Sequence, residues 1–347
     1  MVLIVGLVVA VRKPRRWKGE DIERIAHVLG SVTAARYPES FMRRIVIGLG
    51  GNALLRRGER ADASIQLAHI ALAAKGLARA ANAGQVVIVH GNGPQVGMLA
   101  LESEDDRALT AAYPLDALVA ETQGLLGYWL QQAIHNAGLD GKIATIVTQT
   151  VVDINDPAFA APTKFIGRVY NEQEASKLAA ERGWHIAMDA DRWRRVVPSP
   201  SPVRVVESSI VDSLLELGVT VICAGGAGCA VVEKDRSLLG VEAVVDKDHV
   251  AALLAIDLHA DLLVILTDVP NVVAEYGQPT AHPLGEVTTE QLAAEQFAAG
   301  SMGPKVAAAC HFATSTGRLA VIGSLDEIDA VIAGAAGTRI TSGVHDG

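Results

Sequence analysis

The chain has 347 residues, of which 50% are hydrophobic and only 4% aromatic, and its formal net charge is −9 at pH 7. This length predicts about two domains or one large α/β unit, and the aliphatic composition favours helices packed on a mostly parallel sheet. The acidic charge argues against a nucleic acid partner, so any phosphate that the protein binds must be held by a local group of basic residues.

Residues 1–42 are predicted to be an N-terminal extension outside the fold. The apolar run 1–11 is shorter than the roughly 20 residues that are needed to span a bilayer. The basic residues between Arg12 and Lys18 follow this run, whereas a secretory signal carries its positive charge first. A peripheral membrane anchor is the alternative, but we expect no membrane partner.

The chain after residue 42 begins with two predicted strands, each of which ends in a glycine turn. The apolar residues 45–47 predict a buried strand that runs into the turn 50–52. Residues 85–90 predict a second strand, followed by the glycine turn 91–95 and a helix from about residue 96. This alternation predicts a doubly wound sheet with both turns at its carboxyl edge, where ligands collect.

Regular elements continue along most of the chain. Further strands are predicted over 142–148, 219–223, 262–266 and 318–322, and helices over 63–83, 115–137, 207–217, 250–258 and 325–333. Thr288 and Gln291 predict a capping box, and Pro304 suits the first turn of a helix. The broad apolar surface of 115–137 favours a place in the core, with a dimer contact as the alternative.

Residues 150–206 interrupt this alternation. Prolines and glycines, including the proline-serine run 198–202, predict loops and short strands. We expect an insertion that stands off the main sheet as a flap over the site. Lys164 lies inside it, although a lysine in a loop is usually only a solvated charge.

The cysteines indicate a compartment rather than a site. Cys223, Cys229 and Cys310 show neither a disulfide framework nor zinc-ligand spacing, and so predict reduced thiols in a cytoplasmic protein. The ten histidines are scattered without a metal-site pattern.

Three lysines and three glycine turns carry the predicted chemistry. Lys164, Lys247 and Lys305 each lie just before or within a turn, and a third glycine-rich strand end lies at 225–228. Backbone amides of adjacent glycines bind anions, and lysine adds a flexible cationic donor. Phosphoryl transfer mainly requires alignment of donor and acceptor and neutralisation of the transferred oxygens. The sequence therefore predicts a phosphotransferase, with Mg²⁺ bridging the phosphates.

Other catalytic signatures do not fit this sequence. The turn at 91–97 fails as a nicotinamide-cofactor fingerprint because its third glycine falls one residue late. The sequence contains no Walker loop, no Ser-His-Asp set with a nucleophile elbow and no recognisable Cys-His signature.

Longer motifs run in order along the chain. They are LGGNAL (49–54), HGNGPQVG (90–97), PLDALVAETQGLLGYWL (114–130), PTKFIG (162–167), RWRRVVPSPSP (192–202), GVEAVVDKD (240–248), VILTDV (264–269) and GSMGPKV (300–306). With these motifs the chain resembles, from Arg44 to about Thr341, the carbamate kinase branch of the amino acid kinase family. The words GNGPQ and PTK separate this branch from acetylglutamate and aspartate kinases.

The resemblance implies a fold and a domain organisation. The fold would be α/β, a three-layer αβα sandwich with a central, mostly parallel sheet and a protruding subdomain. The kinase domain would cover 43–341, with the flap subdomain at about 150–206 and a C-terminal tail over 342–347. Members of this branch are cytoplasmic homodimers of arginine metabolism, which would account for the apolar helix 115–137.

The resemblance also implies a reaction, in which ATP and carbamate give ADP and carbamoyl phosphate, reversibly and with Mg²⁺ held through the phosphates rather than by protein ligands. The implied catalytic residues, which hold the phosphates and the migrating group, are Lys164, Lys247, Lys305, Gly50, Gly51 and Asn52. Those that would face carbamate are Gly91, Asn92 and Gly93. Those that would line the nucleotide pocket, or order lysines and metal-bound water, are Asp246, Asp248, Thr267, Asp268, Val269, Tyr276 and Met302.

Some roles and one assignment have alternatives. Asp248 could be only a helix N-cap. His90 is interpreted as a packed strand-end residue, because the nucleophilic oxygen of carbamate is already anionic and needs no base. Phe165, Ala227 and the pair Cys229-Ala230 depart from the pattern of the branch, and Ala227 would add a Cβ beside the expected anion site. The competing functions are a catalytically silent nucleotide- or carbamoyl-phosphate-binding protein and a kinase of another small acid.

Overall fold

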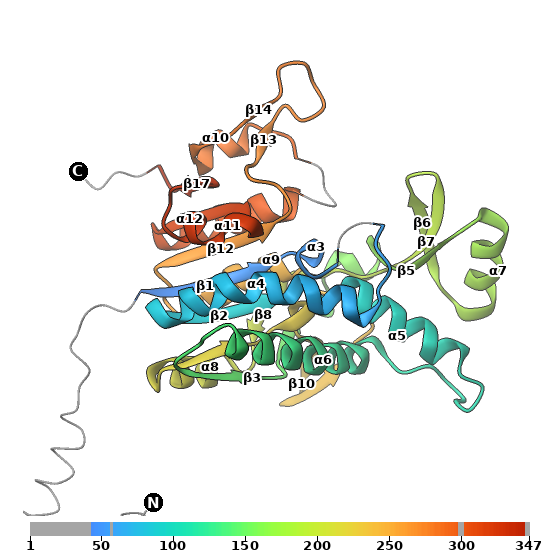
Figure 1. The fold of residues 1–347 in the computed structure, drawn as a ribbon. Coiled ribbons are helices and arrows are strands. Elements are labelled where there is room, and N and C mark those ends of the chain that lie inside the picture. Colours follow the sequence, from blue (N-terminus) through green and yellow to red (C-terminus); the bar gives the residue numbers. More distant parts are fainter. Residues whose placement is uncertain (1–42, 56–57, 298–301, 344–347) are drawn as a thin grey trace, which may run out of the picture. The chain divides into compact units, whose positions relative to one another are not determined.

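A large, mostly parallel sheet forms the centre of the protein in its computed structural model (Figure 1). The structure describes residues 43–55, 58–297 and 302–343, so the predicted extension 1–42 and the last four residues of the predicted tail lie outside the described residues. Within these ranges the sheet has eight strands in the order β15-β17-β16-β12-β1-β2-β9-β3. The strands are β1 (Arg44–Leu49), β2 (Gln85–His90), β3 (Lys142–Thr145), β9 (Val219–Ile222), β12 (Leu262–Thr267), β15 (Glu286–Thr288), β16 (Leu319–Ser324) and β17 (Thr338–Thr341).

Strand direction brings the glycine turns together. β12, β1, β2 and β9 are neighbours and pair in parallel, as do β9 with β3 and β12 with β16. β16 and β17 pair antiparallel. Because parallel strands end at the same edge of a sheet, the turns that follow β1, β2 and β9 meet there, although they are far apart in the chain.

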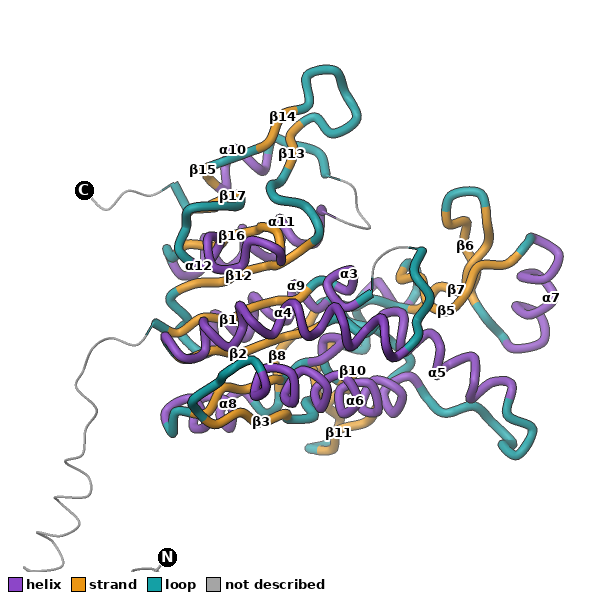
Figure 2. Tube along the Cα trace, in the orientation of Figure 1, coloured by secondary structure: helices purple, strands orange, loops and turns teal. Residues whose placement is uncertain are grey.

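Helices cover both faces of this sheet, which confirms the predicted three-layer αβα fold (Figure 2). On one face lie α4 (Ala63–Ala83), α6 (Leu115–Asn136) and α12 (Ile328–Ile332). On the other lie α8 (Ser208–Glu216), α9 (Lys247–Asp257) and α11 (Met302–Thr316). Alternate side chains of a strand point to opposite faces, so Ile45 and Ile47 of β1 enter the core under α4, whereas Val46 enters the core under α9.

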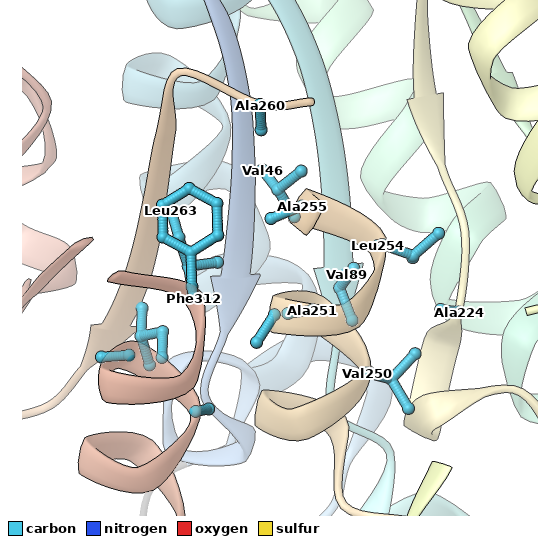
Figure 3. Close-up of a cluster of buried hydrophobic side chains, with 14 of the residues drawn as sticks. Val46, Val89, Ala224, Val250, Ala251, Leu254, Ala255, Ala260, Leu263 and Phe312 are labelled. Atoms are coloured by element: carbon cyan, nitrogen blue, oxygen red, sulfur yellow. The ribbon is translucent and has the colours of Figure 1, made fainter. Parts of the chain in front are cut away.

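The core under α9 is built from small residues. Figure 3 shows Ala255 of α9 beside Val46 of β1, with Ala251 one turn away on the same helix, and Phe312 of α11 near Leu263 of β12. These side chains are fully buried. The small alanines let α9 lie close to the sheet, so the first turn of α9, which carries the lysine and acids at 246–248, is fixed at the sheet edge.

A second sheet contains the strands that flank the predicted insertion. Among the described residues it has four strands in the order β11-β10-β4-β8. They are β4 (Gln149–Val152), β8 (Pro202–Val205), β10 (Cys229–Lys234) and β11 (Ser237–Gly240). The predicted strand 142–148 is therefore wrong in extent, because the chain leaves the central sheet after Thr145 and enters the second sheet at Gln149. β10 and β11 were not predicted.

Residues 164–197, called the protruding subdomain below, stand off one end of the central sheet (Figure 1). Within them three strands pair in the order β5-β7-β6: β5 (Lys164–Tyr170), β6 (His185–Asp189) and β7 (Arg192–Val197). α7 (Glu172–Arg182) connects β5 to β6. Only loops and short strands were predicted for this segment, so the helix α7 was not predicted. Asn171 caps it by accepting a hydrogen bond from the amide of Glu174, and Gly183 ends it in a left-handed conformation.

The remaining elements are one longer helix, α5, and several short pieces. They are α3 (Gly51–Leu54), α5 (Gly93–Asp105), α10 (Thr289–Ala293), β13 (Val273–Ala274), β14 (His282–Pro283) and the 3-10 turns η1 (Pro157–Phe159), η2 (Gly225–Ala227) and η3 (Leu325–Glu327). The capping box of Thr288 and Gln291 is confirmed at the start of α10. Among the residues described, no helix is both long and apolar enough to cross a membrane.

Candidate active site

A cavity of about 200 Å³ lies where the parallel strands end. Its walls come from the glycine turns, the start of the protruding subdomain and the first turns of α9 and α11. The lining residues are Gly51, Gly91, Asn92, Gly93, Pro94, Lys164, Gly226, Val244, Val245, Asp246, Lys247, Asp248, Pro304 and Lys305. The three lysines that were singled out from the sequence thus meet two glycine turns in one cavity.

The first two turns approach each other backbone to backbone. The amide of Gly50 donates to Leu266 O at 2.9 Å, and that of Gly91 donates to Leu49 O at 3.2 Å. A Cβ at Gly50 would lie 3.0 Å from Leu266 O, and one at Gly91 would lie 3.2 Å from Gly51 N. Only glycine allows this spacing without a shift of the backbone. The side chain of Asn52 lies outside what the structure describes.

The second turn starts α5 earlier than expected. The helix begins at Gly93 rather than near residue 96, with Asn92 at the N-cap position. The carboxamide of Asn92 is 3% exposed and donates to Thr122 Oγ1 of α6 at 2.8 Å. This bond holds Asn92 against α6 while the residue still lines the cavity.

Two aspartates hold the three lysines. Lys164 Nζ donates to Asp246 Oδ2 at 2.9 Å, and Lys305 Nζ donates to Asp248 Oδ2 at 3.2 Å. Lys247 Nζ donates to the other oxygen of Asp248. Asp246 also caps α9, because its Oδ1 accepts the amide of Asp248 at 2.9 Å. The N-cap is therefore Asp246, and the alternative that Asp248 is only a cap is wrong.

Charge and burial shift the pKa values of this cluster. Burial alone would raise the pKa of Asp246, but the Lys164 ammonium outweighs it and holds that pKa below its usual range. Burial would also raise the pKa of Asp248, but Lys247 and Lys305 outweigh this effect and lower that pKa. Burial lowers the pKa of Lys247, and Asp248 counters part of this shift. Both carboxylates are therefore ionised at neutral pH and balance two of the three lysine charges, which leaves the cavity able to accept an anion.

The sequence around this cavity matches a known family. The profile of the amino acid kinase family matches residues 43–324 of the chain. The chain belongs to the amino acid kinase family.

Curated relatives in this family carry the name carbamate kinase. The protein of that name from Rhizobium meliloti (strain 1021) is 47% identical over 307 residues, which are 87% of this chain and 94% of the relative. The one from Haemophilus influenzae is 50% identical over 300 residues, 86% of this chain and 96% of the relative. The solved structure of Giardia lamblia carbamate kinase bound to AMP-PNP is 39% identical, has a TM-score of 0.81 and covers 87% of this chain and 99% of that one.

Of the residues expected to form the nucleotide side of this kinase site, Asp246 and Asp248 line the cavity, whereas the other five lie apart from its walls. Thr267 ends β12, the strand beside β1, and donates to Asp268 Oδ1 at 3.0 Å. Val269 follows and is 37% exposed. Met302 begins α11, one turn before Lys305. Tyr276, between β13 and β14, is 83% exposed and does not contribute to the cavity. Their roles toward a nucleotide stay a prediction.

The third glycine turn contributes a residue that the sequence-based site omitted. Gly226 lines the cavity, and its φ of +60° with a Cβ position 2.1 Å from Asn92 Nδ2 leaves room for glycine alone. Its place in a third glycine-rich strand end was the available signal. Ala227 was expected to place a Cβ beside the anion site, but it is fully buried in the hydrophobic core and does not line the cavity.

His90 is buried rather than available as a base. The ring is 1% exposed, and its Nδ1 lies 3.1 Å from the carbonyl oxygen of Gly91. Burial lowers the pKa of His90 to about 4, although the contact with Gly91 opposes this shift. The imidazole is neutral at pH 7 and supports the backbone of the second glycine turn.

Proposed function

We propose that the protein is a carbamate kinase, which transfers a phosphoryl group reversibly between ATP and carbamate to give ADP and carbamoyl phosphate. The observation that carries this proposal is the meeting of Lys164, Lys247 and Lys305 with two glycine turns in one cavity. The identity of 47–50% to proteins named carbamate kinase supports the choice of acceptor within the family.

Catalysis rests on positioning and charge neutralisation. The transferred group needs no covalent partner on the protein, and the anionic oxygen of carbamate needs no general base. Lys247 and Lys305, on the body of the protein, contact the nucleotide phosphates and the migrating group. Lys164 reaches the acceptor and the same group from the protruding subdomain. Ammonium groups held in advance by Asp246 and Asp248 need little reorganisation when charge develops on the transferred oxygens.

Glycine amides divide the site into two parts. Gly50 and Gly51, with Asn52, cradle the phosphoryl group, and Gly91, Asn92 and Gly93 face carbamate. The remaining residues of the proposed site, which form the nucleotide side, are Thr267, Asp268, Val269, Tyr276 and Met302. The strand order favours this division, because β1 lies between β2 on the carbamate side and β12 on the nucleotide side.

Mg²⁺ fits this site through the phosphates of the nucleotide. Among the described residues no group of three or more His, Cys, Asp or Glu side chains could hold a metal ion. Asp246 and Asp248 already accept bonds from lysines, so they suit contacts to metal-bound water better than direct ligation. When bound with the nucleotide, the ion would supply positive charge to the phosphates, and Asp246 and Asp248 would hold its water.

The protein is further proposed to act as a cytoplasmic homodimer in arginine metabolism, with its kinase domain over 43–341 and the flap at about 150–206. Among the described strands, β3 is the edge strand of the central sheet and lies beside α6. Tyr128 of α6 is 57% exposed and Val147 is 48% exposed, beside a hollow of about 690 Å³. An open strand edge with apolar side chains suits a second copy of the chain.

The deciding experiment is ATP formation from ADP and carbamoyl phosphate by the purified protein. We expect ATP from the parent, a loss of at least about 100-fold for Lys305→Ala, and parental activity for Lys75→Ala, which changes an exposed lysine on α4. No ATP from a parent that binds ADP would identify a silent binding protein. Activity with another acyl phosphate but not with carbamoyl phosphate would identify a kinase of a different small acid.

A further inference from the structure

The protruding subdomain is tied to the body of the protein by a carboxylate that the proposed reaction does not use. Glu104 lies near the end of α5, and only 9% of its side chain is exposed. Arg182 Nη1 donates to Glu104 Oε2 at 2.7 Å, and Arg195 Nη1 donates to Oε1 at 2.7 Å. Arg182 ends α7 and Arg195 lies in β7. One side chain of the body therefore holds two elements of the subdomain.

An aromatic ring fixes the two guanidinium groups. Arg182 Cζ lies 5.2 Å from the centre of the Trp184 ring, and Arg195 Cζ lies 5.1 Å from it. A guanidinium within about 6 Å of an aromatic ring is attracted to its face. The two arginines thus share one carboxylate and one ring. We call Glu104, Arg182, Trp184 and Arg195 the Glu104 clamp.

The register of the subdomain sheet connects this clamp to the cavity. Arg195 is the Cα partner of Ile166, which lies two residues after Lys164 on β5. The next residue, Gly167, meets α5 backbone to backbone, since a Cβ at Gly97 would lie 2.8 Å from Gly167 N. A displacement at Arg195 is therefore carried along a short, paired stretch of backbone to Lys164.

The same helix serves both the cavity and the clamp. α5 begins at Gly93, which lines the cavity, and Glu104 lies 11 residues later, or about 16 Å along the helix axis. A second tie reinforces the clamp, because Arg195 Nη2 lies 3.6 Å from Glu242 Oε2, and Glu242 Oε1 accepts the amide of Leu115 at the start of α6. A largely buried carboxylate is costly to desolvate, so its place here is explained by the two arginines that it orients.

We propose that Glu104 is a positioning residue for phosphoryl transfer, which acts through Arg182 and Arg195 to hold the protruding subdomain where Lys164 reaches Asp246. Its kinetic consequence rests on the proposed function, whereas its structural consequence does not. Glu104 does not line the cavity, so it influences the reaction only through the subdomain.

The kinetic test is Glu104→Gln in the ATP-forming assay. We expect kcat to fall by about 10- to 100-fold, as for a reacting group displaced by roughly 1 Å. The KM for ADP is expected to change by less than about twofold, because Lys247 and Lys305, which contact the nucleotide, are on the body of the protein. In a Lys164→Met background the same change is expected to cost less than about twofold, since the effects of coupled residues are not additive. The control is Glu174→Gln, which removes an ion pair with Arg168 that lies wholly inside the subdomain. We expect this control to leave kcat unchanged.

The structural test uses Trp184 fluorescence and needs no activity. Trp17, Trp129 and Trp193 are replaced by Phe so that Trp184 alone is observed. Glu104→Gln is then expected to raise the acrylamide quenching constant of Trp184 at least about 1.5-fold, roughly as for a half-buried ring that becomes exposed. Unchanged quenching overturns the inference, and so does an unchanged kcat in an active parent. An inactive parent overturns the proposed function instead, and quenching then decides the inference. If Glu104→Gln unfolds at assay temperature, Arg182→Gln is tested with the same expectations.

Discussion

Lys164 and Asp246 form an ion pair across the cavity, with 2.9 Å between Nζ and Oδ2, although 82 positions separate them in the chain. Asp246 is also the N-cap of α9, and Lys164 is the first residue of β5. The pair therefore joins the protruding subdomain to a helix whose first turn carries the other charged groups of the site. Because it connects a subdomain to the body, it can report on the closure of the site as well as on its chemistry.

The two roles of Asp246 can be separated by substitution. Asn is as good an N-cap as Asp, so Asp246→Asn keeps the cap and removes the charge that orders Lys164. We expect kcat to fall at least about tenfold and the melting temperature to fall as well, because the ion pair with Lys164 is lost. Asp246→Ala loses the cap as well, and its free energy of unfolding is expected to fall by a further ~1 kcal/mol. Equal rates for the parent and Asp246→Asn would show that the pair has no catalytic importance.

Asp248 keeps two ammonium groups together, so its removal should affect stability strongly. It is 3% exposed and lies between Lys247 and Lys305. Removal of one partner of a buried ion pair leaves uncompensated charge and costs about 3–5 kcal/mol. We expect Asp248→Asn to lose stability on this scale in urea unfolding, and excess ADP to restore part of it, because phosphates supply the missing negative charge.

A matched control for that experiment is Asp191→Asn, which changes an exposed aspartate in the turn between β6 and β7. We expect it to shift stability by less than about 0.5 kcal/mol and to show no additional response to ADP. A similar loss of stability in both variants would contradict the assignment of a special role to Asp248.

Two glycines with the same backbone conformation should respond differently to alanine. Gly226 has φ +60° and Gly183 has φ +67°. A Cβ at Gly226 would lie 2.1 Å from Asn92 Nδ2, whereas one at Gly183 meets nothing within 4 Å. Gly183→Ala is therefore expected to lower the free energy of unfolding by only ~1–2 kcal/mol, which is the cost of a left-handed backbone conformation for a residue with a Cβ. Gly226→Ala should cost more and also lower kcat, because Asn92 must move. Equal unfolding free energies for the two variants would refute this difference.

Buried His90 should make stability depend on pH in a defined window. Its pKa falls from 6.5 to about 4 on folding, so between these values the unfolded chain binds more protons than the folded one. Stability therefore rises with pH in this window, and about 3 kcal/mol is lost as the pH falls from 6.5 to 4. Urea unfolding at pH 7, 5.5 and 4 measures this slope, and His90→Gln is expected to flatten it. The lowered pKa values of Asp246 and Asp248 act in the same direction but only below about pH 4.

The proposed dimer can be tested at the edge of the central sheet. Tyr128→Glu replaces an exposed aromatic side chain beside β3 with a charged one. We expect this variant to sediment as a monomer where the parent sediments as a dimer. The control is Leu72→Glu on α4, where the side chain is 60% exposed on another part of the surface. A parent that sediments as a monomer, or a Tyr128→Glu variant that remains dimeric, would contradict this interface.

The regular elements were predictable where local pattern decides them. The helix 63–83 and the strand 85–90 have the predicted bounds, because each ends at a turn residue that interrupts the apolar periodicity. The strand predicted over 142–148 ran too long, since nothing local marks the point where the chain passes from one sheet to the next. α7 was missed because only its inner face is packed and the surrounding prolines and glycines dominate the pattern of 150–206.

Local sequence determined the chemical groups that build the site: glycine turns after β1, β2 and β9, a lysine at the start of β5, and lysines in the first turns of α9 and α11. Tertiary structure alone decided which of these groups meet. Asp246 pairs with Lys164, Asp248 bridges Lys247 and Lys305, and Glu104 holds the arginines of a distant subdomain. Apart from the contact of Lys247 with its neighbour Asp248, these contacts span 57 to 91 positions. Strand order and helix packing set them, and the partners share no spacing along the chain that could have revealed them.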